Sequence, residues 1–383
     1  MHADPMNSPA HHVQGLDNDE VPPDWPAISA GEIAWLQRRF VELQGDCRLL
    51  WHSPRPFSAA ALVQAPQGRF FIKRHHCSVR SAAVLSEEHR FIAHLAAQGL
   101  PVVQVIADQD GATAVAHSDW TFEVHAEGIG QDLYRDVPSW TPPSSVEQAW
   151  QAGRMLALLH TAAESFHAPQ RATHLLVARD DLIRAEDPIA ALTAQLPDRP
   201  GLAAYLADTP WQAELQRAIL PWHMGLATRL AAEPRLWGHN DWHVSNLLWE
   251  TGSGATKVSS VLDFGLASPT SALYDLATAV ERNAIAWLEL DRGAQAVRGD
   301  IALALLVGYR DARPLSAAQV QLLADLLPVV HLDFALSEVE YFHAITGSRA
   351  NADVAYRTFL LGHADWFRTP AGQGLLATLR GAA

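Results

Sequence analysis

The sequence predicts an α+β chain of two lobes, in which a small, mostly antiparallel β-sheet with one inserted helix precedes a larger, mainly helical lobe. The chain has 383 residues, two to three times the length of a usual domain. Short β-like runs fill residues 45–126, and helical patterns dominate after a Pro-rich stretch at 137–145. We therefore expect a disordered tail over residues 1–25, a first lobe over 26–126 and a second over 127–383.

The first lobe is expected to begin with a helix. Residues 29–44 carry apolar side chains at helical spacing, and Ser29 with Glu32 three residues later forms the pattern of a capping box. A second helix is predicted over 81–98, ending at Gly99. Short runs typical of strands occupy residues 47–52, 58–65, 69–75, 101–107, 112–117 and 120–126. The second and third of these runs should form a hairpin, because Pro, Gln and Gly separate them.

A long helix over residues 145–166 is expected to open the second lobe, and Ala/Leu-rich helices fill residues 271–383. Two β-like runs, 246–250 and 257–264, interrupt this helical texture and are joined by a Gly/Ser/Thr-rich turn. This predicted hairpin lies between the two segments that carry the chemistry.

Composition excludes several classes of protein. The formal net charge is -14, which argues against a general nucleic-acid binder, since such proteins need basic surfaces. The two cysteines, Cys47 and Cys77, are too few for a disulfide framework and fit a reducing cytoplasm. No secretion signal and no apolar run of about 18 residues is visible. We expect a cytoplasmic protein with neither a nucleic-acid nor a membrane partner, and the sequence does not indicate its oligomeric state.

Two polar segments flank the predicted hairpin. Residues 238–246, GHNDWHVSN, contain the pattern H-x-D-x-x-x-x-N, and residues 261–265 read VLDFG. Because a hairpin brings its two ends together, Asn246 and Asp263 can face one site, where their oxygens suit Mg²⁺. Asp241, on the loop before the hairpin, could orient an attacking hydroxyl and accept its proton. This set of groups indicates phosphoryl transfer.

These segments resemble the catalytic and metal-binding motifs of the aminoglycoside phosphotransferase and choline kinase superfamily, and the resemblance extends over about residues 45–345. It implies a two-lobed protein-kinase-like fold and transfer of the γ-phosphoryl group of Mg-ATP to a hydroxyl of a small molecule. The acceptor would be an aminoglycoside, choline or another amino alcohol, homoserine or a sugar. The resemblance implies that Asp241 is the catalytic base or orients the substrate, and that Asn246 and Asp263 are the magnesium ligands. It also implies that His239 braces the catalytic loop and that Asp275 caps a helix or braces the same loop.

The small lobe should supply the groups that bind ATP. Lys73 lies in an apolar strand, where a cation is costly without an anionic partner. The resemblance implies that Lys73 orients phosphates and pairs with a helix glutamate. Glu88 is the first candidate, since apolar residues follow it at i+3, i+4 and i+7, and Glu87 is the second. Backbone groups of Val124 and Ala126, at the expected hinge, would bind adenine.

One feature departs from the protein-kinase pattern, because no glycine-rich loop occurs between Trp51 and Lys73. Residues 53–58 read SPRPFS instead. Backbone N–H groups and the Ser58 hydroxyl could still bind phosphate there, and Arg55 could add positive charge.

The acceptor site is less clearly marked. Late in the second lobe, Asp333, Glu338, Glu340 and Tyr341 form a polar stripe, which the resemblance would place against a cationic substrate. A solvated helix face is the alternative interpretation. His243 could contact the substrate or simply pack.

Three other functions remain open. A Ser/Thr protein kinase of the same fold is one, although no Ala-Pro-Glu segment follows Gly265. A non-catalytic nucleotide-binding regulator is the second. The third is a metallohydrolase that uses His239, Asp241 and His243 as zinc ligands, which would leave Lys73 and the segment at 261–265 unexplained.

Overall fold

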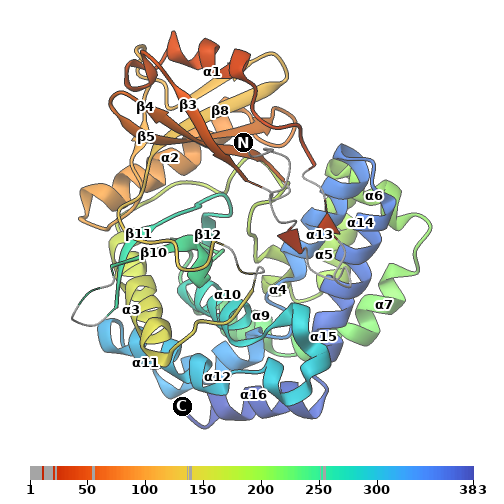
Figure 1. Ribbon diagram of the computed structural model, residues 1–383. Helices are drawn as coiled ribbons and strands as arrows, with labels where there is room; N and C mark the ends of the chain where they lie inside the picture. The colour runs from red at the N-terminus through yellow and green to blue at the C-terminus, as the bar shows by residue number, and fades with distance from the viewer. Residues whose placement is uncertain are drawn as a thin grey trace.

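The chain folds into a small β-sheet lobe and a larger helical lobe (Figure 1), as the sequence predicts. The computed structural model describes residues 11–12, 20–21, 24–53, 57–135, 137, 140–250, 252 and 256–383. Most of the predicted tail, and Arg55, lie outside these residues. Within the tail, β1 (His11–His12) pairs antiparallel with β2 (Glu20–Val21).

The small lobe is a six-stranded sheet in the order β3-β4-β5-β8-β6, with β7 also paired to β8. Every neighbouring pair is antiparallel. Its elements are α1 (Ala30–Gln37), a 3₁₀ turn (Val41–Leu43), β3 (Arg48–His52), β4 (Ala59–Ala65), β5 (Gly68–His76), α2 (Ala82–Ala97), β6 (Val105–Ile106), β7 (Ala114–His117) and β8 (Trp120–Ala126). The capping box of Ser29 and Glu32 is present at the start of α1. The run at 101–107 forms only the two residues of β6.

Alternation along β5 divides the sheet into two faces. Phe70 and Ile72 are buried in the core beneath α1, together with Ile33 and Leu36 of that helix. The alternate residues Phe71 and Lys73 lie on the opposite face, which borders a cavity between the lobes. Because side chains alternate along a strand, an apolar strand can present one lysine to this cavity.

The large lobe is mainly helical. Its helices are α3 (Val146–Ala163), α4 (Asp181–Arg184), α5 (Pro188–Gln195), α6 (Pro200–Leu206), α7 (Trp211–Ala218), α8 (Leu220–His223), α9 (Leu226–Ala231), α10 (Ala272–Ala284), α11 (Gly299–Ala312), α12 (Ala317–Leu326), α13 (Leu332–Glu340), α14 (Arg349–Asp353), α15 (His363–Trp366) and α16 (Pro370–Arg380). Short 3₁₀ segments occupy Leu196–Asp198, Val244–Asn246 and Trp287–Ala296, and π-helices occupy Tyr341–Ile345 and Val354–Gly362. The strands are β9 (Leu236–Gly238), β10 (Leu247–Glu250), β11 (Lys257–Val261) and β12 (Ser268–Thr270). β10 and β11 form the predicted hairpin.

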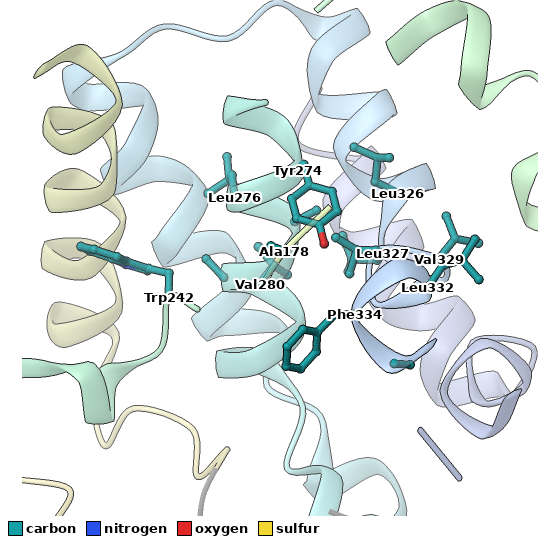
Figure 2. Packing of buried hydrophobic residues seen from close by; sticks show 14 of the residues in the cluster. Ala178, Trp242, Tyr274, Leu276, Val280, Leu326, Leu327, Val329, Leu332 and Phe334 are labelled. Atoms are coloured by element: carbon teal, nitrogen blue, oxygen red, sulfur yellow. The ribbon is translucent and has the colours of Figure 1, made fainter. Parts of the chain in front are cut away.

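Helix α10 is the centre of the large lobe, and every residue from Leu273 to Ala284 is buried. Figure 2 shows Val280 of α10 on the side of Trp242, and Tyr274 of the same helix on the side of Leu326 and Leu327. Because this helix is buried on all sides, the polar side chains that project from it are held in defined positions.

Helices α3 and α11 pack unusually closely. A Cβ added to Gly153 would lie 2.1 Å from the Leu305 carbonyl oxygen, and one added to Gly308 would lie 2.0 Å from that of Trp150. A side chain at either position would force the helices apart. The reciprocal glycines therefore set the distance between these two helices.

Two residues at the end of the predicted tail, Asp24 and Trp25, connect the two lobes. The Trp25 indole N–H donates to the Phe57 carbonyl (3.1 Å) and to the Tyr341 hydroxyl (3.0 Å). That hydroxyl donates to Asp24 (2.9 Å), which also accepts from the Phe57 amide (3.1 Å). Asp24 and Trp25, which the sequence assigned to the tail, thus bridge a small-lobe turn and the first π-helix.

Candidate active site

A cavity of about 380 Å³ lies between the lobes, and it is bordered by Lys73, Asp241, Asn246 and Asp263. These side chains are up to 190 residues apart in sequence. The volume is within the usual range for small-molecule sites. The fold therefore brings the four predicted polar groups to one cavity.

Asp275 of α10 holds the catalytic loop from below. Its carboxylate accepts the backbone N–H groups of His239 and Asn240, each at 2.7 Å, and lies 2.9 Å from the Nε2 atom of His160. The side chain is fully buried. Ser271, rather than Asp275, caps α10. Of the two roles expected for Asp275, the contacts therefore match the loop brace.

His239 links this loop to the segment after the hairpin. Its Nδ1 atom accepts the Asp241 amide (3.2 Å), so Nε2 carries the proton and donates to the Leu262 carbonyl (2.8 Å). The ring also packs on Phe264, with centroids 4.7 Å apart. Because both ring nitrogens are engaged by backbone groups, His239 is not available as a zinc ligand. This contact pattern weighs against the metallohydrolase.

Two residues of the site adopt left-handed backbone conformations, Asn240 (φ 61°) and Asp263 (φ 56°). Asn and Asp tolerate this region better than most residues. The Asn240 amide is fixed by a hydrogen bond to the Ser268 carbonyl (3.1 Å) and one from the Thr270 hydroxyl (2.7 Å). These polar bonds hold a backbone geometry that the local sequence alone would not favour.

The Asp241 carboxylate faces the cavity beside a guanidinium. Arg282 of α10 donates to Asp241 Oδ1, and Asn246 donates to the other carboxylate oxygen at 3.2 Å. Burial works to raise the pKa of Asp241, but the charge of Arg282 and, less strongly, that of His243 outweigh it and hold the pKa below its ordinary value. The carboxylate therefore stays ionised and can accept a hydrogen bond from a hydroxyl group.

Arg282 was not foreseen from the sequence. It lies seven residues after Asp275 on the same helix, a spacing that puts both side chains on one face. Once Asp275 is expected to brace the loop at 238–246, this spacing is the signal that could have identified Arg282.

The donor chemistry of Asn246 and Asp263 fits a hard divalent cation. The Asn246 Nδ2 atom donates to the Asp241 carbonyl (2.9 Å), which leaves the carbonyl oxygen Oδ1 as the atom for a ligand. The backbone carbonyl of Asn246 accepts a hydrogen bond from the Leu262 amide (2.9 Å). This bond places Asp263, the next residue after Leu262, close to Asn246. The Asp263 carboxylate is half-exposed and borders the cavity. One amide oxygen and one carboxylate, with room for phosphate oxygens and water, suit Mg²⁺.

Lys73 pairs directly with Asp263, Nζ to Oδ1 at 3.1 Å. Burial alone would lower the pKa of its ammonium group, but the negative charges of Asp263, Glu123 and Glu88 outweigh burial and raise it. Lys73 is therefore a charged group at the wall of the cavity. Glu123 of β8 lies directly opposite Lys73 in the antiparallel pair of β5 and β8.

The predicted Glu88–Lys73 pair is replaced by other contacts. Glu88 is buried and lies 3.3 Å from the Nη1 atom of Arg171, while its effect on Lys73 is that of a more distant charge. Arg171 is itself fully buried and needs an anion. Glu87, the second candidate, lies 3.7 Å from the same guanidinium.

Arg171 and Arg80, neither of which the sequence singled out, tie the small lobe to the segment after the hairpin. Both donate to the Gly265 carbonyl, at 3.0 Å and 3.2 Å respectively. Arg80 follows β5, and Arg171 also donates to the Val84 carbonyl of α2 (3.0 Å). A single arginine in a polar loop carries no sequence signal for such a role.

The other predicted nucleotide contacts differ in their placement. Ser58 and Ala126 border the cavity, whereas Val124 is buried within the sheet. The Ala126 amide already donates to the Gln104 carbonyl (2.9 Å). A nucleotide that hydrogen-bonded this amide would have to displace that contact.

The residues proposed for the acceptor divide into two groups. His243 and Glu338 border the cavity, next to Phe334 and Phe342. Glu340 instead pairs with Arg199 at 2.8 Å and is buried. Tyr341 is buried and bonds Asp24 and Trp25, as described above. Glu340 faces away from the cavity because it is two residues from Glu338 on α13 and so lies on another face of the helix. Tyr341 begins the π-helix and contacts Asp24 and Trp25 instead.

Glu338 has an unusual environment for an acid. Burial raises its pKa to about 8, with Arg282 opposing the shift and Asp241 adding to it. An acid held neutral at the wall of a cavity is a candidate for contact with a ligand.

The two lobes, the cavity between them and the groups around it define a kinase-like phosphotransferase. The chain belongs to the phosphotransferase enzyme family, which residues 57–315 match. It is 30% identical over 248 residues to a homoserine kinase of Xanthobacter autotrophicus, a match that covers 64% of this chain and 66% of that protein. The family is thus one of phosphotransferases, and this relative is named as a kinase.

Solved structures agree on the fold. An aminoglycoside phosphotransferase from Alicyclobacillus acidocaldarius superposes with a TM-score of 0.53 at 18% identity, covering 94% of this chain and 97% of that one. Amicoumacin kinase hAmiN, in complex with AMP-PNP and Ca²⁺, superposes with a TM-score of 0.57 at 14% identity, covering 84% and 88%. No helix in the described ranges is both long and apolar enough to cross a bilayer.

Proposed function

We propose that the protein transfers the γ-phosphoryl group of Mg-ATP to a hydroxyl group of a small molecule. The observation that carries this proposal is the convergence of Lys73, Asp241, Asn246 and Asp263 on one cavity between the lobes. Phosphoryl transfer requires positioning and charge stabilisation more than covalent chemistry from the protein, and this set supplies both.

Each residue has a distinct role in the proposed reaction. Asp263 and Asn246 Oδ1 would hold Mg²⁺, which neutralises charge on the transferring group when bound. Lys73 would exchange part of its contact with Asp263 for phosphate oxygens. Asp241, kept ionised by Arg282, would accept a hydrogen bond from the attacking hydroxyl and then its proton.

We propose further that the acceptor carries an amine as well as a hydroxyl. Glu338 borders the acceptor side of the cavity, and Phe334 and Phe342 line the same side. An ammonium group would stabilise the ionised form of Glu338 and pack against the aromatic rings. Homoserine and aminoglycosides, which the names of two relatives contain, both carry amines.

A screen of ATP consumption tests the proposal. The panel should contain aminoglycosides, choline and other amino alcohols, homoserine, sugars and a peptide pool with Ser and Thr, and products should be identified by mass spectrometry. Phosphorylated small molecules in wild type but not in Asp241→Asn are the expected result. Phosphorylated peptides alone would favour the protein-kinase alternative. Nucleotide binding without any transfer would favour the regulator and contradict an enzymatic role.

A further inference from the structure

A cluster of histidines in the small lobe has no role assigned in the proposed reaction, although His75 and His125 border the same cavity. Glu123 of β8 is buried, and three imidazoles surround its carboxylate. Nε2 of His89 and Nε2 of His125 each lie 2.7 Å from Oε2, and Nε2 of His75 lies 2.9 Å from Oε1. We propose that His89, Glu123 and His125 form a binding site for a divalent transition-metal ion, Zn²⁺ in particular, separate from the magnesium ligands.

The geometry of the three ligand atoms suits one ion. They all lie within 4.8 Å of one another, and the rings of His89 and His125 meet at 76°. In a tetrahedral zinc site with bonds of about 2.0–2.1 Å, ligand atoms are separated by roughly 3.3 Å. The present contacts would open by about 0.6 Å, a movement that side-chain rotation can supply.

Neighbouring side chains hydrogen-bond the proposed ligands, as residues next to a metal site commonly orient the residues that bind the ion. The Nδ1 atom of His89 lies 2.8 Å from the Thr113 hydroxyl, which can accept its proton and leave Nε2 with a lone pair. His75 occupies the second carboxylate oxygen of Glu123. The three ligands come from α2 and β8, and the sheet fixes Glu123 and His125 two residues apart on one face.

The charge of the site favours a cation. With neutral imidazoles, the buried Glu123 carboxylate leaves the ligand set with one negative charge, which a divalent cation offsets. Two imidazoles and one carboxylate leave an open position for water, as in zinc sites with three protein ligands. Among the residues that the structure describes, this is the one such grouping of His, Cys, Asp and Glu side chains.

The alternative occupant is protons alone, with the imidazoles donating N–H groups to the carboxylate. Either a metal ion or imidazole N–H groups would provide partners for the Glu123 carboxylate. A measurement of metal content is therefore needed to distinguish the two alternatives. The chain also contains His11 and His12 near its N-terminus, which provide a matched control for adventitious binding.

The test is zinc stoichiometry on the full chain. Chelator-stripped protein is loaded with Zn²⁺, dialysed and measured by elemental analysis. We expect one retained zinc per chain in wild type and in His11→Gln/His12→Gln, and none in His89→Gln/His125→Gln. Thr113→Val, which removes only an outer partner, should weaken zinc binding about 10–100-fold. Equal retention by wild type and His89→Gln/His125→Gln, or no retention by wild type, would overturn the proposal.

A second measurement protects the test against misfolding of the double variant. Wild type loaded with Co²⁺ should give the intense visible absorption of a tetrahedral nitrogen and oxygen site, without the thiolate charge-transfer band that Cys47 or Cys77 would produce. Zn²⁺ should also raise the melting temperature of wild type, since it binds the folded state. A weak octahedral cobalt spectrum, or a thiolate band, would contradict the assignment even if the double variant did not fold.

Discussion

The two walls of the cavity in the large lobe are built differently. On the catalytic-loop wall, the buried polar groups bond one another, and Asp275 alone accepts from two backbone amides and lies beside His160. On the wall formed by α13, Glu338 carries a pKa raised to about 8 and borders the cavity that Phe334 and Phe342 also line. The polar groups of the first wall hydrogen-bond one another and fix the geometry of the loop. The second wall contains an acid, Glu338, whose charge no neighbouring group fully compensates and which borders the cavity.

The difference separates positioning from recognition. A carboxylate saturated by fixed donors stabilises the fold and cannot respond to a ligand. A buried acid with a shifted pKa is unfavourable to the fold and becomes favourable when a ligand supplies the missing charge. Substitutions on the two walls should therefore have opposite effects on stability.

The largest effect is expected at Asp263, through which the segment after the hairpin meets the small lobe. Asp263→Ala removes a proposed magnesium ligand and the partner of Lys73. We expect turnover to fall by more than the roughly 10²–10⁴-fold typical of a general base, and magnesium-dependent ATP binding to weaken. Isothermal titration with and without Mg²⁺ measures this. Asp311→Ala, which removes an exposed carboxylate paired with Arg154, is the control, and wild-type turnover by Asp263→Ala would refute the metal assignment.

Asp241→Asn tests the catalytic-loop wall more selectively. The amide keeps the size of the side chain but cannot accept a proton. We expect turnover to fall about 10²–10⁴-fold while ATP affinity stays near that of wild type. Steady-state kinetics on the acceptor found by the screen, with nucleotide titration as the control, measure both. A matching loss of ATP affinity would instead indicate that Asp241 holds the nucleotide.

Sequence reasoning located one of these walls better than the other. The residues of the catalytic loop were predictable because each sits at a fixed offset beside a hairpin, and a hairpin brings its ends together whatever surrounds it. Glu340 and Tyr341 were placed on the acceptor side by proximity in sequence to Glu338. Glu340 is two residues from Glu338 and so lies on another face of α13, beside Arg199. Tyr341 begins a π-helix, a change of periodicity that the local sequence does not indicate, and its hydroxyl bonds Asp24.

Partners supplied by distant segments were the least predictable feature. The Glu88–Lys73 pair was inferred from helix spacing, which was correct in burying Glu88. The choice between Lys73 and Arg171 as its partner depends on a loop about 80 residues later in the chain. Local pattern fixes which face of an element a side chain occupies, but not which distant charge meets it there.

Asp275→Asn should mainly affect stability. The amide retains one acceptor oxygen, but its NH₂ group would replace the other. That NH₂ group would then face backbone N–H donors, of His239 or Asn240, from which the carboxylate now accepts hydrogen bonds. We expect the free energy of unfolding to fall by about 2–4 kcal/mol, measured by urea denaturation. Asp311→Asn is the matched surface control. An unchanged unfolding free energy would show that the brace is not a source of stability.

Glu338→Gln should have the smallest effect and the opposite sign. The folded-state pKa of Glu338 is about 8, against an ordinary value of 4.5, so the folded state binds a proton that the unfolded state releases between these values. Wild-type stability is therefore lost as pH rises from about 4.5 to 8. Glutamine stays neutral, so the variant should match wild type near pH 5 and exceed it at pH 9 by about 1–2 kcal/mol, after allowance for solvent in the cavity.

Asp333→Asn is the control that separates stability from recognition on this wall. Asp333 lies on the same helix, is fully buried, and has a pKa raised to about 8 mainly by burial, but it does not border the cavity between the lobes. Both variants should flatten the dependence of melting temperature on pH. Only Glu338→Gln should raise the KM for an amine-bearing acceptor, because only Glu338 can meet its ammonium group. Equal KM values in the two variants would mean that the unbalanced acid serves the fold rather than the acceptor, and the contrast between the two walls would then be one of stability alone.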